Sequence, residues 1–258
     1  MPAKTIDDVL TELENIIAEA IQTHNRMGYF AALYYKVTAS VKEGIARGQF
    51  ENGPQMELFD VLFASRYLDA LNAWNNNQPV TGSWQVAFDA TKSSSPLVLQ
   101  HLLLGMNAHI NLDLGIAAVA ASGGKLDGIQ KDFESINVII SSLTNQVLNE
   151  IDRVWPLSAF FGFHSSNQAS LLIQFSIDNA RDGAWCFAEA LARKQGADYD
   201  ACIAHRDQAI KKLGDCLTEN RGFIRSAIWL IHLFEWKTPG KIIKVMHQAV
   251  KQEIVLGG

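Results

Sequence analysis

The stretch LQHLLLGMNAHINLDLGIAA, residues 99–118, decides the fold that the sequence predicts. An ordinary surface helix has one apolar face, whereas this stretch is apolar on nearly every side. We therefore expect a helix over about residues 95–121 that is buried at the centre of a helical bundle. It would begin at Ser95 and Pro96, a typical N-cap and first helical position, and end at Gly123 and Gly124.

Apolar residues recur at helical spacing over most of the remaining chain, and no segment alternates as a strand does. Residues 75–94 are polar and rich in turn formers, so we expect a loop there. The sequence thus predicts a single all-α domain over 1–258, a bundle of about eight to ten helices around the central one. The other predicted helices cover about 6–21, 26–47, 54–74, 126–152, 167–194, 198–218, 220–236 and 239–253.

The amino-acid composition limits which kinds of protein this chain can be. The 258 residues are 48% hydrophobic and 19% charged, with a formal net charge of −5, which suits a globular protein with a sizeable core. No basic run is present, and this argues against nucleic acid as a partner. The N-terminus lacks the apolar core of a signal peptide, and the three cysteines form no CxxC pair. We therefore expect a cytoplasmic protein with reduced thiols.

The central segment, residues 97–121, is long enough to cross a bilayer, because about 20 apolar residues suffice. Its composition argues against this, since two histidines, two asparagines and one aspartate at mid-depth would each be costly in lipid. We expect the core helix of a soluble bundle and no membrane span.

Five hydrogen-bonding side chains interrupt this apolar helix, namely His101, Asn107, His109, Asn111 and Asp113. A buried polar group without a partner costs about 1–3 kcal/mol, so these groups need partners inside the protein. His109 and Asp113 lie one helical turn apart on the same face. Gly105 thins that side of the helix and makes room beside the two histidines.

Three interpretations of this pattern stay open. In the first, His109 and Asp113 bind one divalent transition metal, and His101 or a group from another helix completes the set of ligands. In the second, they are catalytic acid–base groups, and Asp113 orients the His109 imidazole and raises its basicity. In the third, they form a satisfied buried network that locks the packing of the helices. Because so many polar groups fall within thirteen residues, we favour a functional pocket.

The segment HLLLGMNAHINLDL, residues 101–114, resembles the signature of a bacterial family of helical proteins of unknown function. That signature is a Gly-x-Asn-Ala-His-Ile-x-x-Asp-Leu core with a histidine four residues before the glycine. The upstream segment FDVLFASRYLDAL, residues 59–71, is also similar to family sequence. The resemblance implies a helical fold and a site on the central helix, and it implies no reaction.

Further side chains are candidates for binding a substrate. Arg66 lies on an apolar helix, where a buried arginine usually pairs with a carboxylate or clamps an anionic ligand. Asp178 and Arg181 share one stripe of the helix 167–194, where Asp178 could supply a carboxylate and Arg181 could pair with Asp113. His164 lies in the aromatic segment FFGFHSS, which could form a pocket wall. Asn107 could contact the ligand or bridge to a neighbouring helix.

The sequence favours an enzyme that acts on a small apolar or amphipathic molecule in a buried His/Asp pocket. The chemistry would be metal-assisted hydrolysis or oxidation, or general-base catalysis by histidine. The alternatives are a non-catalytic helical protein that binds a hydrophobic small ligand, and a structural bundle with a buried polar network. No phosphate loop, GxSxG elbow or HExxH zinc motif is present, so the sequence names no reaction class.

Overall fold

The computed structural model describes residues 3–136, 138–140, 167–218 and 238–248, and within 167–178 it describes the backbone alone. This part of the chain is helical and contains no strand, which confirms the predicted all-α bundle. Its α-helices are α1 (Ile6–Thr23), α2 (Gly28–Ala46), α3 (Gly53–Asn75), α4 (Gly82–Thr91), α5 (Val98–Ala108), α6 (Leu114–Ser122), α8 (Asn167–Ala192), α9 (Gly196–Thr218) and α11 (Pro239–Gln248). Residues 130–136 and 138–140 are helical as well.

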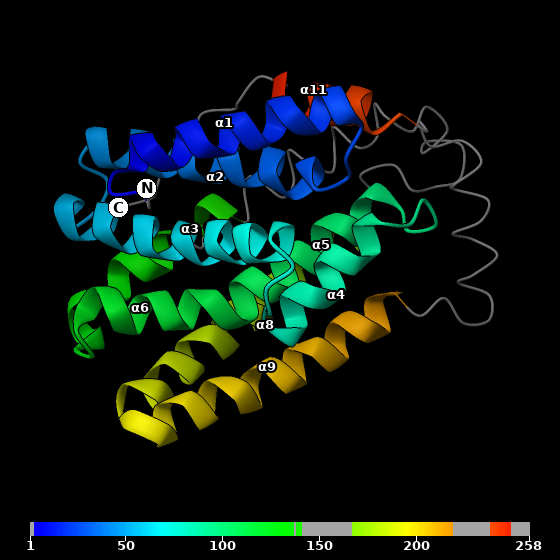
Figure 1. Cartoon of the computed structure of the whole chain (residues 1–258). Coiled ribbons are helices and arrows are strands. Elements are labelled where there is room, and N and C mark those ends of the chain that lie inside the picture. The colour runs from blue at the N-terminus through cyan, green and yellow to red at the C-terminus, as the bar shows by residue number, and fades with distance from the viewer. Residues whose placement is uncertain (1–2, 137, 141–166, 219–237, 249–258) are drawn as a thin grey trace.

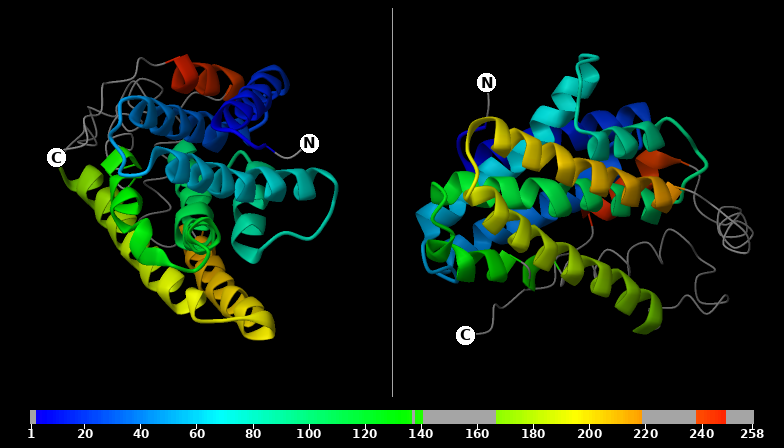
Figure 2. Two further views of the ribbon diagram at one scale, coloured as in Figure 1. Left: turned by 90° about the vertical axis from the view of Figure 1, so that its left-hand side faces the viewer. Right: turned by 90° about the horizontal axis from the view of Figure 1, so that it is seen from below.

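The central rod of the bundle consists of α5, a π-helical turn over His109–Asp113, and α6. Helices α2 and α3 pack on one side of this rod, and α8 and α9 pack on the other (Figures 1 and 2). Helix α4 lies against both α5 and α9, while α1 and α11 cover the outer side of α2. The middle helix is thus enclosed by helices from both ends of the chain, as its apolar sequence predicts.

The central rod begins later than the sequence predicts. Ser95 and Pro96 lie outside the helix, and α5 starts at Val98. The side chain of Gln100 accepts a hydrogen bond from the backbone amide of Leu97 at 3.0 Å. A glutamine three residues into the helix therefore satisfies an amide at its start, the role that we expected of a serine cap.

Helix α4 occupies part of the segment that we expected to be a loop. The backbone amides of Gly82 and Ser83 donate to the carboxylate of Asp207 on α9, at 2.7 and 2.9 Å. A carboxylate at a helix N-terminus stabilises it, because it satisfies free amides and faces the positive end of the helix dipole. The loop prediction was wrong because this cap comes from a residue more than a hundred positions away. Trp84 and Phe88 are buried beneath the helix.

A π-helical turn interrupts the α-helical hydrogen bonding of the central rod. The amide of Leu114 donates to the carbonyl of His109, five residues earlier. Such turns are rare and occur often at functional sites. The Nε of Arg206, on α9, donates to the carbonyl of Asn111 at 3.0 Å, which ties the widened turn to the outer helix.

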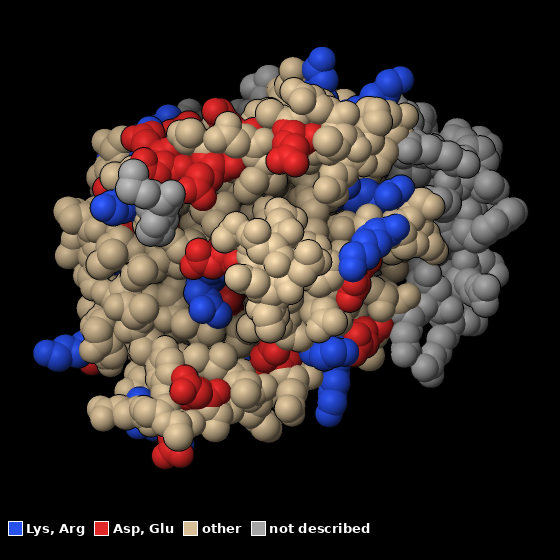
Figure 3. Space-filling model, viewed as in Figure 1, with Lys and Arg blue, Asp and Glu red and all other residues tan. Residues whose placement is uncertain are grey.

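The central rod is the one helix among the described residues that is long and apolar enough to cross a membrane. The most apolar 18-residue window of Val98–Ser122 has a mean hydropathy of 1.4, and 83% of that window is buried inside the bundle. Such burial is what a core helix shows. On the face drawn in Figure 3, acidic side chains gather over α1, and basic side chains lie singly or in small groups.

Gly105 allows a close approach between α5 and α2. A Cβ atom at position 105 would lie 2.6 Å from Cγ of the Phe30 ring, and Phe30 is buried. We expect Gly105→Ala to lower the free energy of unfolding by about 1–2 kcal/mol, because overpacking outweighs the gain in helix propensity of about 1 kcal/mol. Urea unfolding measures this change.

The matched control is Gly128→Ala, since a Cβ atom there would meet nothing within 4 Å. Its free energy of unfolding should stay within a few tenths of a kcal/mol of wild type or rise slightly. Equal losses for the two variants would contradict the close approach of Phe30.

Candidate functional site

Asp113 is the centre of a buried hydrogen-bond network and is 0% exposed. Its Oδ1 accepts from Nε of Arg66 at 3.1 Å, and its Oδ2 accepts from Nε1 of Trp84 at 2.8 Å. The Oδ2 atom also lies 3.2 Å from Nδ1 of His109. Side chains from three helical segments therefore contact one carboxylate. Arg66 lies on α3, Trp84 lies on α4, and His109 lies in the π-helical turn.

This network fixes which nitrogen of His109 carries the proton. The guanidinium of Arg66 and the indole of Trp84 can only donate hydrogen bonds, so Asp113 faces them as an accepting carboxylate. The third contact of that carboxylate becomes a hydrogen bond when Nδ1 of His109 carries the proton and acts as the donor. The other nitrogen, Nε2, then holds the free lone pair of the neutral ring.

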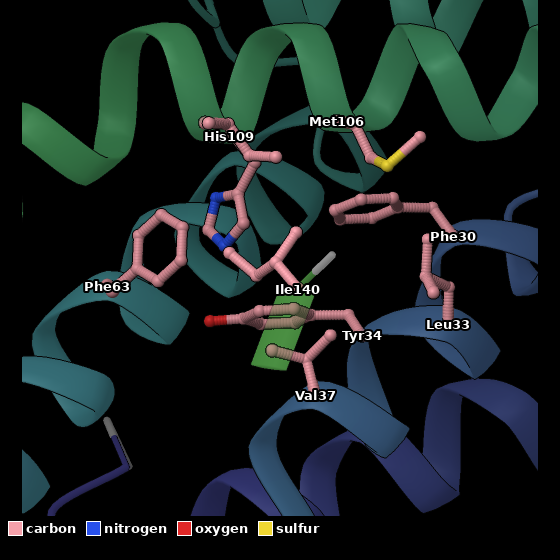
Figure 4. A pocket seen from close by; sticks show the side chains of 9 residues that line it. Phe30, Leu33, Tyr34, Val37, Phe63, Met106, His109 and Ile140 are labelled. Carbon is pink, nitrogen blue, oxygen red and sulfur yellow. The ribbon is translucent and has the colours of Figure 1, made fainter. Parts of the chain in front are cut away.

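Aromatic rings hold the imidazole on its remaining sides. The ring of Phe63 stacks on that of His109 with centroids 3.7 Å apart and planes within 6°. The ring of Tyr34 lies at 87° to it with centroids 4.6 Å apart, so the histidine presents an edge to the tyrosine face (Figure 4). The ring of Phe30 lies on a third side, with its centroid 5.8 Å from that of His109. The orientation of His109 is therefore set by packing as well as by Asp113.

A small cavity of about 20 Å³ lies beside His109, between α2, α3 and the central rod. This volume admits about one water-sized or methyl-sized group. Nε2 of His109 is buried and has no hydrogen-bond partner within the described part of the chain. The cavity is lined by Phe30, Leu33, Tyr34, Val37, Phe63, Met106, His109, Ile110 and Ile140 (Figure 4).

Burial lowers the pKa of His109, because the charged ring would lose its hydration. The hydrogen bond to Asp113 and its charge oppose this shift, and the charge of Arg66 adds to it. The ring is thus neutral at pH 7, with its basic nitrogen inside an apolar enclosure. Such an arrangement can take a proton from a group that enters the cavity.

His101 does not join this site, although the sequence grouped it with His109 and Asp113. It lines a different cavity, and the ring of Phe30, which fills the space beside Gly105, borders both cavities. Among the residues with described positions, no group of three or more His, Cys, Asp or Glu side chains could hold a metal ion. The predicted three-residue metal set is therefore not assembled by these side chains.

The other predicted residues have separate positions. Asn107 donates to the carbonyl of Ile210 on α9 at 3.0 Å and accepts from the Asn111 amide at 3.0 Å, so it bridges two helices and lines neither cavity. Arg66, not Arg181, pairs with Asp113, which corrects the expected partner. Arg181 is half-buried on α8.

Two further candidates cannot be placed. The side chain of Asp178 lies outside the described residues, although its backbone belongs to α8. His164 lies outside them altogether.

Sequence reasoning missed two residues near the site, Trp84 and Asp60. Trp84 lies in a segment whose apolar residues recur at i, i+3 and i+4, a weak helical signal within a polar stretch. Asp60 is buried on α3, one turn before Phe63. An acidic residue inside the apolar run FDVLF was the available signal, because burial of a lone carboxylate needs an explanation.

The fold and the site define an all-α protein whose central helix buries a histidine–aspartate pair in an aromatic enclosure. The chain belongs to a family of unknown function (DUF5995), whose sequence profile matches residues 6–220. The predicted resemblance to a helical family of unknown function is thereby confirmed. The match runs from α1 to the end of α9 and includes the whole central rod. No curated protein and no solved structure matches the chain.

Proposed function

We propose that this protein is an enzyme in which His109 acts as a general base on a small apolar or amphipathic molecule. One observation supports this above all others. Nδ1 of His109 faces Asp113 at 3.2 Å, while the buried Nε2 has no hydrogen-bond partner among the described residues and belongs to a side chain that lines a cavity. An oriented imidazole with one free nitrogen is what proton abstraction requires.

The surroundings of His109 favour the charged ring that forms when Nε2 takes a proton. The carboxylate of Asp113 would stabilise the imidazolium through Nδ1, as in a histidine–aspartate pair of a catalytic triad. The stacked ring of Phe63 and the face of Tyr34 add cation–π attraction. Because these groups are already in place, they need little reorganisation during the reaction.

The lining of the cavity bears on the kind of substrate. A buried water needs two to four polar partners, and the surface that the described lining residues present to the cavity is apolar. We therefore propose proton abstraction from the substrate itself rather than activation of a water molecule. The cavity volume fits the reacting end of the substrate, a group of about methyl size, rather than a whole molecule.

A metal-assisted version of this proposal has less support. Both oxygens of Asp113 already accept hydrogen bonds from obligate donors, Arg66 and Trp84. A cation bound there would displace those donors and lie beside a guanidinium charge. We further propose a cytoplasmic location and a small-molecule partner rather than nucleic acid or a membrane, in keeping with the net charge of −5.

The proposal is tested with nitromethane in D₂O, a probe whose methyl group fits the cavity and gives a proton to a base. The nitronate that forms takes a deuteron from the solvent, and proton NMR follows the loss of the methyl signal. We expect the wild-type protein to exceed free imidazole at equal concentration and pH. His109→Gln should lower the rate by about 100-fold or more, the usual contribution of a general base.

The matched control is His205→Gln, because His205 is exposed on α9, and this variant should keep the wild-type rate. A second readout does not depend on the probe. The ¹⁵N chemical shifts of His109 at pH 7 should show a proton on Nδ1 and none on Nε2. A proton on Nε2, or a probe rate that His109→Gln leaves unchanged, would contradict the proposal.

The mostly apolar lining also supports a second candidate function, a protein that binds a hydrophobic ligand without turnover. In that case xenon, an apolar atom about as large as a methyl group, would bind in the cavity and raise the melting temperature of wild type, and the probe would undergo no catalysed exchange. His109→Gln would then weaken binding but abolish no reaction.

A further inference from the structure

A second cavity of about 20 Å³ lies around His101, and Phe30 lines both this cavity and the one beside His109. It lies between the start of α2, the end of α4 and the middle of α5. Its walls include the aromatic rings of Phe30, Tyr67, Trp84 and Phe88. Nothing in the proposed reaction at His109 uses this space.

His101 is the unexplained polar group in this cavity. It is 5% exposed, and neither imidazole nitrogen has a hydrogen-bond partner among the residues described. A neutral imidazole offers one N–H donor and one acceptor, and leaving both unmade in the interior is costly. Tyr67 also lines the cavity, and its hydroxyl is buried without a partner in the same part of the chain. Such groups point to a ligand that supplies their hydrogen bonds.

Arg26 supplies the charge at this cavity. It is half-buried, and its one hydrogen bond to the described residues is a long 3.5 Å contact from Nη1 to the carbonyl of Thr91. A guanidinium has five N–H donors, so within this part of the chain most of its hydrogen-bonding capacity remains for a ligand. No carboxylate is among the described lining residues. The described lining thus combines a cation and an imidazole N–H and brings no carboxylate to repel an anion.

We propose that the His101 cavity is a second ligand site, which takes a carboxylate oxygen of a small molecule beside His101 while Arg26 pairs with the carboxylate group. A cavity of about 20 Å³ admits one group of that size. Arginine pairs well with a carboxylate because two parallel N–H groups match its two oxygens. Burial and the nearby charge of Arg26 lower the pKa of His101 to about 4, so the ring is neutral at pH 7 and donates through one N–H.

The site is tested with sodium acetate titrated into the full-length protein at pH 7, against sodium chloride at equal ionic strength. We expect acetate, and not chloride, to shift the side-chain NMR signals of Arg26 and His101 saturably and to raise the melting temperature. Arg26→Gln should weaken acetate binding by at least about tenfold. Because Arg26 is half-buried and has one long hydrogen bond to the described residues, this variant should keep its fold, which circular dichroism checks.

The matched control is Arg193→Gln, an exposed arginine on the segment after α8, which should leave acetate binding unchanged. His109→Gln should also leave it unchanged, so this test and that of the proposed reaction can fail separately. The proposal is overturned if acetate causes no saturable shift, or if Arg26→Gln and Arg193→Gln bind it equally well.

Discussion

Asp113→Ala is expected to lower the free energy of unfolding by about 3–5 kcal/mol, because two buried donors lose their acceptor at about 1–3 kcal/mol each. The substitution leaves the indole N–H of Trp84 and Nδ1 of His109 without an acceptor, and both side chains are almost fully buried. The Arg66 side chain is 38% exposed and can turn toward water. The loss therefore comes mainly from the two orphaned ring nitrogens rather than from the ion pair.

Asp113→Asn is the graded comparison. Its amide oxygen can accept from Trp84 and His109 while its NH₂ group displaces only the half-exposed Arg66. We expect a smaller loss, about 1–2 kcal/mol. Urea unfolding of the three proteins at pH 7 measures the series. A loss below about 1 kcal/mol for Asp113→Ala would mean that the network does not hold α3, α4 and the central rod together.

Asp60→Asn is expected to stabilise the protein, and the gain should grow with pH. Asp60 is 1% exposed, and its Oδ2 has no hydrogen-bond partner among the described residues. Burial, helped by the charge of Glu57, raises the pKa of Asp60 to about 8. The folded protein therefore keeps this proton over a pH range in which the unfolded chain, with a pKa of about 3.9, has lost it.

The sign of the effect follows from proton linkage. Stability due to a raised pKa is fully present below the unfolded pKa and is lost as the pH rises through the folded pKa of about 8. Over these roughly four pH units, wild type loses at most about 5 kcal/mol, at about 1.4 kcal/mol per unit. A neutral asparagine avoids this loss.

Urea unfolding at pH 4 and pH 8 measures the predicted divergence. Wild type and Asp60→Asn should be similar at pH 4, and the variant should be several kcal/mol more stable at pH 8. Asp69→Asn is the matched control, because Asp69 is exposed on the same helix, and it should follow wild type at both values. If the free energy of unfolding changes equally with pH for wild type and Asp60→Asn, the folded protein does not hold Asp60 in its protonated form.

Two features of the candidate site could be predicted from the sequence alone. The apolar residues around 99–118 predict a buried helix, and the spacing of His109 and Asp113 places both on one side of it. Both predictions depend on helical periodicity, which is a local property of the chain. The structure confirms the buried helix, and it shows the histidine and aspartate in contact.

The partners of these residues could not be predicted in the same way. Periodicity gives no information about which side chains approach from other helices. Arg66 and Trp84 reach Asp113 from 47 and 29 residues away, and the cap of α4 comes from Asp207 on α9. The π-helical turn likewise has no signal in apolar spacing. Each of these features depends on where separate helices come together.

The sequence by itself determined that this chain is helical, that one helix is buried, and that polar groups on that helix need partners. Only the tertiary structure decided that Phe30 packs against Gly105 and borders two separate cavities, one beside each histidine. It also decided that Asp113 is held by Arg66 rather than Arg181. The physical reason is that local hydrogen bonds and apolar spacing set the helices, whereas side-chain packing between helices sets their relative positions.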